Sequence, residues 1–244
     1  MTTVDIAIRF DQVNYSADGT QNQILKNITG SIPDGNITTL VGPSGAGKTT
    51  LFKLCNGLQS PDSGDIFIKE KNIDSYEPVD LRRNVGIALQ KATMITGSVQ
   101  KNLELPLKLR GKELSEDRAK ELLKIVGLED TFLQKKTKDL SGGQRQKLSI
   151  ARTLVNRPEI LLLDEITSSL DSVSRQDIEA LIGKINRQYS TTILWITHNL
   201  QQALSIGDYT WVMMNGEVVE TGESSFLRDP QNDRVKQFVR GEIE

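Results

Sequence analysis

The sequence contains very little cysteine and histidine, with one residue of each among 244. A single cysteine excludes an internal disulfide, and one cysteine with one histidine excludes a zinc-finger type of site. Any chemistry that needs an imidazole must therefore use His198. The 30 Lys and Arg residues are balanced by 32 Asp and Glu residues, so no basic field favours nucleic acid as the main partner.

Long hydrophobic runs are also missing. The apolar stretches Ile160–Leu163 and Thr191–Thr197 have the length of strands, well short of the roughly 18 residues that a spanning helix needs. The N-terminus alternates apolar and charged residues and lacks the basic start and apolar core of a signal peptide. We therefore expect a cytoplasmic protein that needs a separate membrane partner if it works at a membrane.

The composition is otherwise that of a globular protein, with 37% hydrophobic and 25% charged residues. Residues 4–41 and 60–90 consist of short apolar stretches separated by turn signals, which predicts strands, the last of them at Val85–Leu89. Between these two regions, Lys48–Gly57 has the spacing of a helix, and Leu58 falls on its apolar face.

Residues 98–136 are rich in Leu, Lys and Glu at helical spacing, which predicts a helical insert in a strand-rich body. After the insert, apolar strands alternate with helices, and this alternation predicts a largely parallel sheet covered on both faces. An Asn215-Gly216 turn then predicts a hairpin. The expected elements are helices over Gly142–Asn156, Ser172–Tyr189 and Leu200–Ile206, and strands over Ile160–Asp164, Thr191–Thr197, Tyr209–Met214 and Glu217–Thr221.

The segment from Gly42 to Thr49 fits G-x-x-x-x-G-K-[ST] at every position and lies between a predicted strand and a predicted helix. That context is the one a phosphate-binding loop requires. Its backbone N–H groups converge on the β-phosphate, and the helix start adds a favourable dipole. Lys48 is expected to bridge the β- and γ-phosphates, and the Thr49 hydroxyl to coordinate Mg²⁺. The sequence therefore predicts nucleotide binding.

Two carboxylates, Asp164 and Glu165, end the buried strand that begins at Ile160. Such a pair alone often only begins a loop, but downstream of a phosphate-binding loop it favours a functional role. Asp164 is expected to hold Mg²⁺ through water, and Glu165 to accept a proton from the attacking water.

The string Leu140-Ser-Gly-Gly-Gln144 ends the helical insert and begins a predicted helix. Two bare glycine amides, a hydroxyl and the helix dipole make this start a second anion site. Together with Gly42–Thr49 and Asp164, the string closely resembles the ATP-binding-cassette (ABC) ATPases over nearly the whole chain. The resemblance implies the P-loop NTPase ABC ATPase fold, an α/β class with a mixed or parallel sheet core, an antiparallel β subdomain and a helical insert.

The resemblance assigns roles to further residues. Gln90 matches the glutamine that senses Mg²⁺ and the attacking water, and His198 matches the switch histidine that contacts the γ-phosphate. Ser168–Asp171 matches the loop that crosses the dimer interface, and Tyr15 the aromatic that stacks on adenine. It thus assigns catalysis to Glu165, His198 and Gln90, Mg²⁺ contacts to Thr49, Gln90 and Asp164, and ATP contacts to Tyr15, Gly42, Pro43, Ser44, Gly45, Ala46, Gly47, Lys48, Thr49, Thr50, Ser141, Gly142, Gly143, Gln144 and Asp171.

In this family the Ser-Gly-Gly helix serves the ATP held by the other subunit, so a homodimer with ATP at the interface is implied. We expect one ABC ATPase domain over residues 1–244, in which 1–90 and 140–244 form the catalytic core with its β subdomain and 91–139 form the helical subdomain. The stretch Ala92–Leu107 is the candidate groove for a separate multi-span permease, which would place the chain on the inner face of the cell membrane.

Three departures from the family pattern bear on the subfamily, namely Leu89, Ile166 and Asn199. The strings Asp164–Asp171 and Ile193–His198 resemble the ATPase of an iron-export pair, and this favours metal export. Similarity to phosphate- and amino-acid-importer ATPases is also substantial, so an importer is the alternative. A soluble ATPase of the iron–sulfur-assembly type is a further alternative, whereas Glu165 and His198 argue against a scaffold that does not hydrolyse ATP.

Overall fold

The computed structural model describes residues 5–17 and 22–243, so the outermost residues of the domain expected over 1–244 lie outside the described part. The described strands form two sheets with the orders β2-β1-β4-β5 and β10-β9-β3-β8-β7-β6. The first sheet is antiparallel and consists of β1 (Ile6–Ser16), β2 (Gln23–Pro33), β4 (Ser63–Ile68) and β5 (Lys71–Asn72). The second consists of β3 (Ile37–Val41), β6 (Val85–Ala88), β7 (Ile160–Asp164), β8 (Thr192–Ile196), β9 (Tyr209–Met214) and β10 (Glu217–Glu223).

Every pairing in the second sheet is parallel except that of β9 with β10, which form the expected hairpin. Asn215 and Gly216 have φ values of 52° and 83°, the left-handed values that a tight hairpin turn requires. The helices are α1 (Lys48–Cys55), α2 (Pro78–Asn84), α3 (Val99–Lys108), α4 (Glu116–Ile125), α5 (Gly142–Leu154), α6 (Ser172–Tyr189), α7 (Leu200–Ile206) and α8 (Asp233–Val239).

The parallel sheet has hydrophobic cores on both faces because successive side chains of a strand point to opposite faces. On β7, Ile160 and Leu162 pack with α1 and the antiparallel strands, whereas Leu161 and Leu163 pack with α3, α4, α5 and α6. All four side chains are fully buried. The expected covering of both faces is thereby confirmed, and it explains why β7 is apolar throughout.

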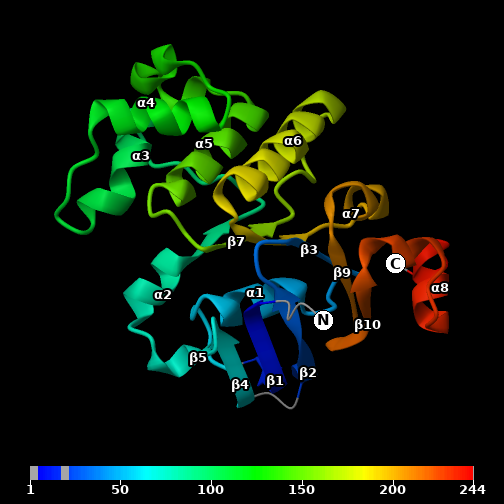
Figure 1. Cartoon of the computed structure of the whole chain (residues 1–244). Helices are drawn as coiled ribbons and strands as arrows, with labels where there is room; N and C mark the ends of the chain where they lie inside the picture. The colour runs from blue at the N-terminus through cyan, green and yellow to red at the C-terminus, as the bar shows by residue number, and fades with distance from the viewer. Residues whose placement is uncertain (1–4, 18–21, 244) are drawn as a thin grey trace.

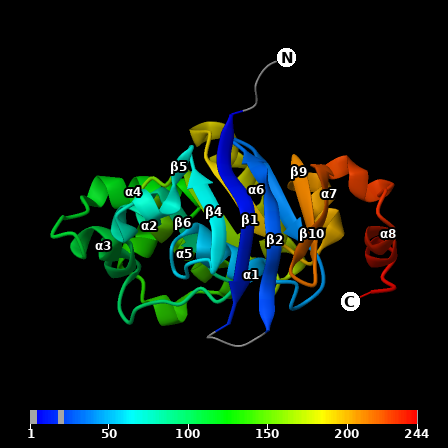
Figure 2. The ribbon, with the colours of Figure 1, turned by 90° about the horizontal axis from the view of Figure 1, so that it is seen from below.

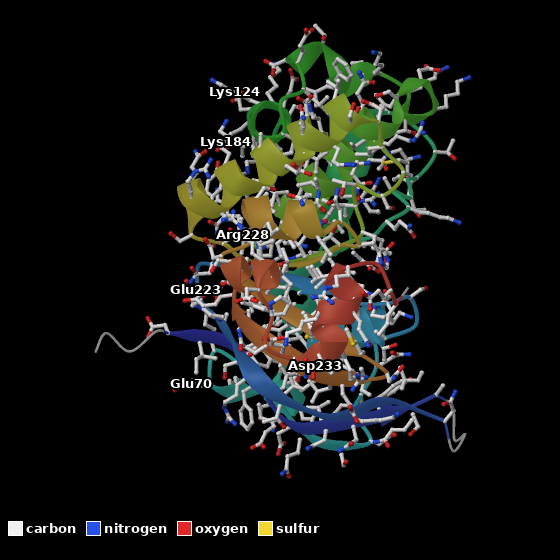
Figure 3. All side chains as sticks on the ribbon, turned by 90° about the vertical axis from the view of Figure 1, so that its right-hand side faces the viewer. Glu70, Lys124, Lys184, Glu223, Arg228 and Asp233 are labelled. Atoms are coloured by element: carbon white, nitrogen blue, oxygen red, sulfur yellow. The ribbon has the colours of Figure 1, made fainter. Side chains whose placement is uncertain are left out.

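The layers are visible in Figure 1, where α1 lies between the parallel sheet and the antiparallel strands, and the helices of the insert lie beyond the other face. Figure 2 shows the antiparallel sheet from its outer side, with the insert and α8 at opposite flanks. Lys124 of α4 and Glu70 of the β4–β5 turn lie near opposite ends of the molecule in Figure 3. None of the helices in the described residues is long and apolar enough to cross a membrane.

Two expectations for the first 90 residues were wrong. Residues 60–90 are not all strand, because α2 occupies Pro78–Asn84. Pro78 stands at the first helical position, which its fixed φ favours, and Leu81 is the only residue of this helix that is buried. Leu58 was expected on the apolar face of the preceding helix, together with Leu51 and Leu54, but that helix ends at Cys55 and Leu58 is 53% exposed.

Candidate nucleotide-binding and hydrolysis site

The site is formed at the carboxyl ends of four neighbouring strands, in the order β3-β8-β7-β6. The Gly42–Thr49 loop follows β3, His198 follows β8, Asp164 and Glu165 end and follow β7, and Gln90 follows β6. Parallel strands present their carboxyl ends at one edge, and ligands of open α/β sheets bind there. Residues that are up to 156 positions apart in sequence, from Gly42 to His198, therefore share one sheet edge.

The loop before α1 requires glycine at its two ends. Gly42 has φ 142°, and a Cβ there would lie 1.9 Å from the carbonyl oxygen of Met213 on the adjacent strand. Gly47 has φ 96°, and a Cβ there would lie 2.7 Å from Leu25 Cδ2. These close approaches fix the loop against β9 and β2. The loop residues between them are Pro43, Ser44, Gly45 and Ala46, and Thr50 lies in the first turn of α1.

Lys48 is buried at the centre of this loop. Its Nζ atom donates hydrogen bonds of 2.8 Å to the carbonyl oxygens of Gly42 and Pro43. Burial lowers the pKa of the Lys48 ammonium, whereas the carboxylates of Glu165 and Asp164 act in the opposite direction. The cation is therefore held in place by neutral carbonyls and lies within the field of both carboxylates.

Asp164 and Thr49 lie side by side, with 3.2 Å between Thr49 Oγ1 and Asp164 Oδ1. Burial raises the pKa of the Asp164 carboxyl, the hydrogen bond from Thr49 lowers it, and the nearby Glu165 raises it again, so the net shift is upward. A buried carboxylate beside a hydroxyl is a set of hard oxygen ligands, which is what Mg²⁺ prefers. These residues fit the expected cation.

Glu165 has an unusual backbone, with φ 49° in the left-handed region. Its N–H donates to Ile196 O at 3.1 Å, and its carbonyl accepts the Ser168 N–H at 3.1 Å and hydroxyl at 2.9 Å. Left-handed non-glycine residues are costly and concentrate at functional sites. These bonds on both sides hold the strained residue and so direct its side chain.

The Glu165 carboxylate contacts two other predicted site residues. Its Oε1 lies 2.5 Å from His198 Nε2, and its Oε2 lies 3.4 Å from Gln90 Nε2. Gln90 also donates to Ser168 Oγ at 3.0 Å. Ser168 is a site residue that the sequence predicted only as part of the interface loop; its position three residues after Glu165 was the available signal. A pocket of ≈ 260 Å³ lies beside these groups, lined by Glu165, Thr167, Ser168, Arg175, Thr197, His198 and Asn199.

The Ser141–Gln144 helix start is built differently. Ser141 Oγ accepts the Gln144 N–H at 3.2 Å, and Gln144 Oε1 accepts the Ser141 N–H at 3.0 Å, which is a complete capping box. Gly142 and Gly143 form the first turn, beside a pocket of ≈ 270 Å³. Among the described residues, no hydrogen bond joins this start to the Gly42–Thr49 loop.

The two remaining predicted residues have local structural partners. Asp171 caps α6, where its carboxylate accepts the Ser174 N–H at 2.9 Å and hydroxyl at 2.7 Å. Tyr15 lies on β1 opposite Leu25, the residue that also contacts Gly47, and its ring is partly buried against the core. Tyr15 and Gly47 thus share Leu25 as a neighbour.

Known sequences similar to this chain are ATP-binding proteins of ABC transporters. The family model described as "ABC transporter" matches residues 25–168. The putative ABC transporter ATP-binding protein YjkB of Bacillus subtilis is 40% identical, over 97% of this chain and 94% of that protein. The methionine import ATP-binding protein MetN of Mesorhizobium japonicum is 40% identical over 88% of this chain and 60% of its own length.

Solved structures agree with the sequence relatives. The cbiO1 protein of Clostridium perfringens, part of the ABC transporter complex cbiONQ, superposes with a TM-score of 0.84 at 29% identity, over 97% of this chain and 96% of that one. The dimeric ATP-binding cassette MJ0796 bound to ADP and Pi has a TM-score of 0.78 at 30% identity, over 89% of this chain and 98% of that one.

Proposed function

The chain belongs to the ABC transporter family and is its ATP-binding, ATP-hydrolysing type of subunit, and we propose that its hydrolysis drives cargo through a separate membrane permease. The observation that carries the assignment of the site is the meeting of Lys48, Gln90, Asp164, Glu165 and His198 at one sheet edge. Lys48 follows β3, Gln90 follows β6 and His198 follows β8, whereas both carboxylates come from the end of β7.

In this proposal the Gly42–Thr49 loop holds the phosphates of ATP, and Lys48 exchanges its loop carbonyls for phosphate oxygens. Thr49, Asp164 and Gln90 would hold Mg²⁺, which supplies charge neutralisation of the β- and γ-phosphates when bound. Glu165 accepts a proton from the attacking water, and His198 donates a hydrogen bond to the γ-phosphate. The strained backbone and the contacts with His198 and Gln90 support the role of Glu165.

We propose that two copies bind head-to-tail with ATP between them. The Ser141–Gln144 helix start is separate from the phosphate loop of its own chain, which leaves it available to a second chain. The similarity to a dimeric cassette with ADP and Pi supports the same arrangement. The tyrosine at position 15 would stack on the adenine, since it lies beside Gly47 through Leu25.

The test of this site is Glu165→Gln, which keeps the shape of the side chain but removes the base. We expect ATP to bind and to trap a dimer without turnover, detected as an ATP-dependent doubling of mass in solution. The control is the same variant with Lys48→Ala, which should not form the dimer. A Glu165→Gln protein that hydrolyses ATP at the parental rate would contradict the assignment of Glu165 as the base.

The composite nature of the site has its own experiment. Lys48→Ala removes the phosphate ligand of one half-site, and Ser141→Ala removes the hydroxyl of the other. A mixed dimer of the two variants contains one intact composite site, so mixing two poorly active proteins should raise the rate of hydrolysis. If the sites were complete within one chain, mixing would give only the average of the two separate rates.

A groove beside α2 and α3 is the proposed docking site for the permease. It has a volume of ≈ 520 Å³ and combines apolar side chains, including Leu58, Val79, Leu105 and Leu109, with Arg82, Arg83, Arg110 and Arg152. Leu58, Val79 and Leu109 are 53%, 57% and 79% exposed. Large exposed apolar groups with a charged rim mark interaction sites. The groove fits a permease helix that carries both leucines and carboxylates.

This groove includes Leu105 and Pro106 from the expected stretch Ala92–Leu107. Its other residues come from α2, β6 and α5 and from the segments after α1, α3 and α5. Arg110→Glu should release the protein from membranes that contain its permease. The matched control is Lys184→Glu, which makes the same charge change at an exposed position on α6 (Figure 3). If both variants stay on the membrane, docking in this groove is contradicted. If both leave the membrane, the loss is a general effect of the charge change.

The transported cargo is proposed from sequence similarity. The strings Asp164–Asp171 and Ile193–His198 favour export of a metal such as iron. The 40% identity to a methionine importer favours an importer as the second candidate. Cells that contain the permease and the parental chain should lose radioactive iron faster than cells with Glu165→Gln. Faster uptake of an amino acid or of phosphate, with iron unaffected, would select the importer.

A further inference from the structure

Gln202 is a buried amide on a short helix behind the proposed hydrolysis site. It lies in the first turns of α7, four residues after His198, and its side chain is 3% exposed. A buried amide must find hydrogen-bond partners or lose stability. Its partners come from two segments that lead to catalytic groups and from a third element, α6.

The two catalytic segments meet at this side chain. Thr197, directly before His198, donates its hydroxyl to Gln202 Oε1 at 2.5 Å. Gln202 Nε2 donates to the Oγ1 of Thr167 at 3.1 Å, and Thr167 lies two residues after Glu165. Both threonines are buried, at 4% and 5% exposure. Gln202 therefore bridges the segments that carry the two members of the 2.5 Å Glu165–His198 contact.

The orientation of the amide is set by a carboxylate on α6. Gln202 Nε2 donates to Glu179 Oε1 at 2.6 Å, so the amide oxygen is directed toward Thr197. The helix is also fixed from its start, where Asn199 Oδ1 accepts the Gln202 N–H at 3.2 Å and the Asn199 N–H donates to Thr197 Oγ1 at 3.0 Å. Every polar atom of the Gln202 side chain is thereby used.

We propose that Gln202 is a positioning residue, which holds Glu165 and His198 in register through Thr167 and Thr197 and is oriented by Glu179. The inference rests on the proposed roles of Glu165 and His198. It explains why an amide stands at a buried position: the site needs one acceptor for Thr197 and one donor for Glu179, and an uncharged amide offers both.

The experiment reverses the donor and the acceptor. Gln202→Glu places two carboxylates against each other, and we expect kcat for ATP hydrolysis to fall about tenfold or more because small displacements of reacting groups are costly. Glu179→Gln keeps the hydrogen bond and should stay near the parental rate. The double variant restores one donor and one acceptor with the roles exchanged and should recover most of kcat. Gln201→Glu, exposed on the same helix, is the matched charge control and should be neutral.

Two measurements separate positioning from general damage. The ATP dissociation constant should stay near the parental value in all variants that fold. The chain has one histidine, so the imidazole NMR signals report His198 without ambiguity. These signals should shift in Gln202→Glu and return in the double variant. If Gln202→Glu does not fold, Thr197→Val, which removes the hydroxyl, and Thr197→Ser, which keeps it, give the same comparison, with kcat lost in the first and retained in the second.

The inference is overturned if folded Gln202→Glu keeps the parental kcat, if the double variant shows no recovery, or if Thr197→Val equals Thr197→Ser. The failure of the proposed function looks different. In that case Glu165→Gln would hydrolyse ATP at the parental rate, whatever the Gln202 variants do.

Discussion

The two edges of the parallel sheet use the same kinds of polar residue for different purposes. At the amino edge, Asp34 accepts hydrogen bonds from Lys69 and from Thr192, the latter at 2.7 Å, and Asp208 accepts the Ile37 N–H at 2.8 Å. At the carboxyl edge, Asp164 and Glu165 face Thr49, Gln90 and His198. Within the described residues, the hydrogen bonds of Lys48 Nζ go to the loop carbonyls of Gly42 and Pro43. The carboxylates of the amino edge thus find their hydrogen-bond partners within the protein.

The pKa values of Asp34 at the amino edge and Asp164 at the carboxyl edge are shifted in opposite directions. Burial raises the pKa of Asp34, but hydrogen bonds from Lys69 and Thr192 outweigh it and the pKa lies below its usual value. For Asp164, burial and the nearby Glu165 prevail over the bond from Thr49, and the pKa is raised. The fold stabilises the charge of the structural carboxylate. It disfavours that of the functional one, because burial outweighs the fields of Lys48 and Lys53.

The largest expected effect comes from Asp164→Asn. Loss of one preorganised electrostatic contact at a phosphoryl-transfer site costs about 10²–10³ in kcat, and we expect a loss of that order. The nucleotide-free protein should nevertheless melt at a higher temperature, because a neutral amide replaces a carboxylate that burial disfavours. Steady-state hydrolysis and thermal unfolding without nucleotide measure the two effects. A lower melting temperature would show that this carboxylate stabilises the ligand-free fold.

Asp34→Asn should give the opposite pair of results. Hydrolysis should stay near the parental rate, and the free energy of unfolding should fall by about 1–2 kcal/mol, the contribution of hydrogen bonds to a partly exposed charged group. Urea unfolding at neutral pH measures the change. Asp74→Asn, at an exposed position, is the control and should be neutral. If Asp34→Asn lost activity without losing stability, the division of roles between the two edges would be wrong.

Some parts of the fold could be predicted from the sequence and others could not. Helix α6, helix α7 and strand β9 have the predicted bounds, because capping and turn residues mark their ends: Asp171 and Asn199 cap the two helices, and the Asn215-Gly216 turn ends β9. Helix α2 was missed because one buried residue, Leu81, gives no periodic pattern. The exposure of Leu58 was missed as well, because the left-handed Gly57 (φ 66°) ends the helix before it, and the Leu58 N–H donates back to Lys53 O at 2.9 Å.

Each site residue at the carboxyl edge was predicted as the polar end of an apolar strand or as part of a motif. Their meeting depends on the strand order β3-β8-β7-β6, which no local pattern encodes. Gln202 had no sequence signal at all. A glutamine in a short helix reads as surface, and only the tertiary contacts with Thr167, Thr197 and Glu179 reveal that it is buried.

The smallest predicted effect is a pH dependence that belongs to the amino edge alone. Since the pKa of Asp34 is lower in the folded chain than the unfolded value of about 3.9, its contribution is fully present above the unfolded pKa. It is lost as the pH falls through the lower, folded pKa. The difference in urea midpoint between the parental chain and Asp34→Asn should therefore stay constant from pH 7 to about pH 5 and shrink below about pH 4. A difference that grew on acidification would mean that the charge of Asp34 is not stabilised by the fold, and the contrast with Asp164 would disappear.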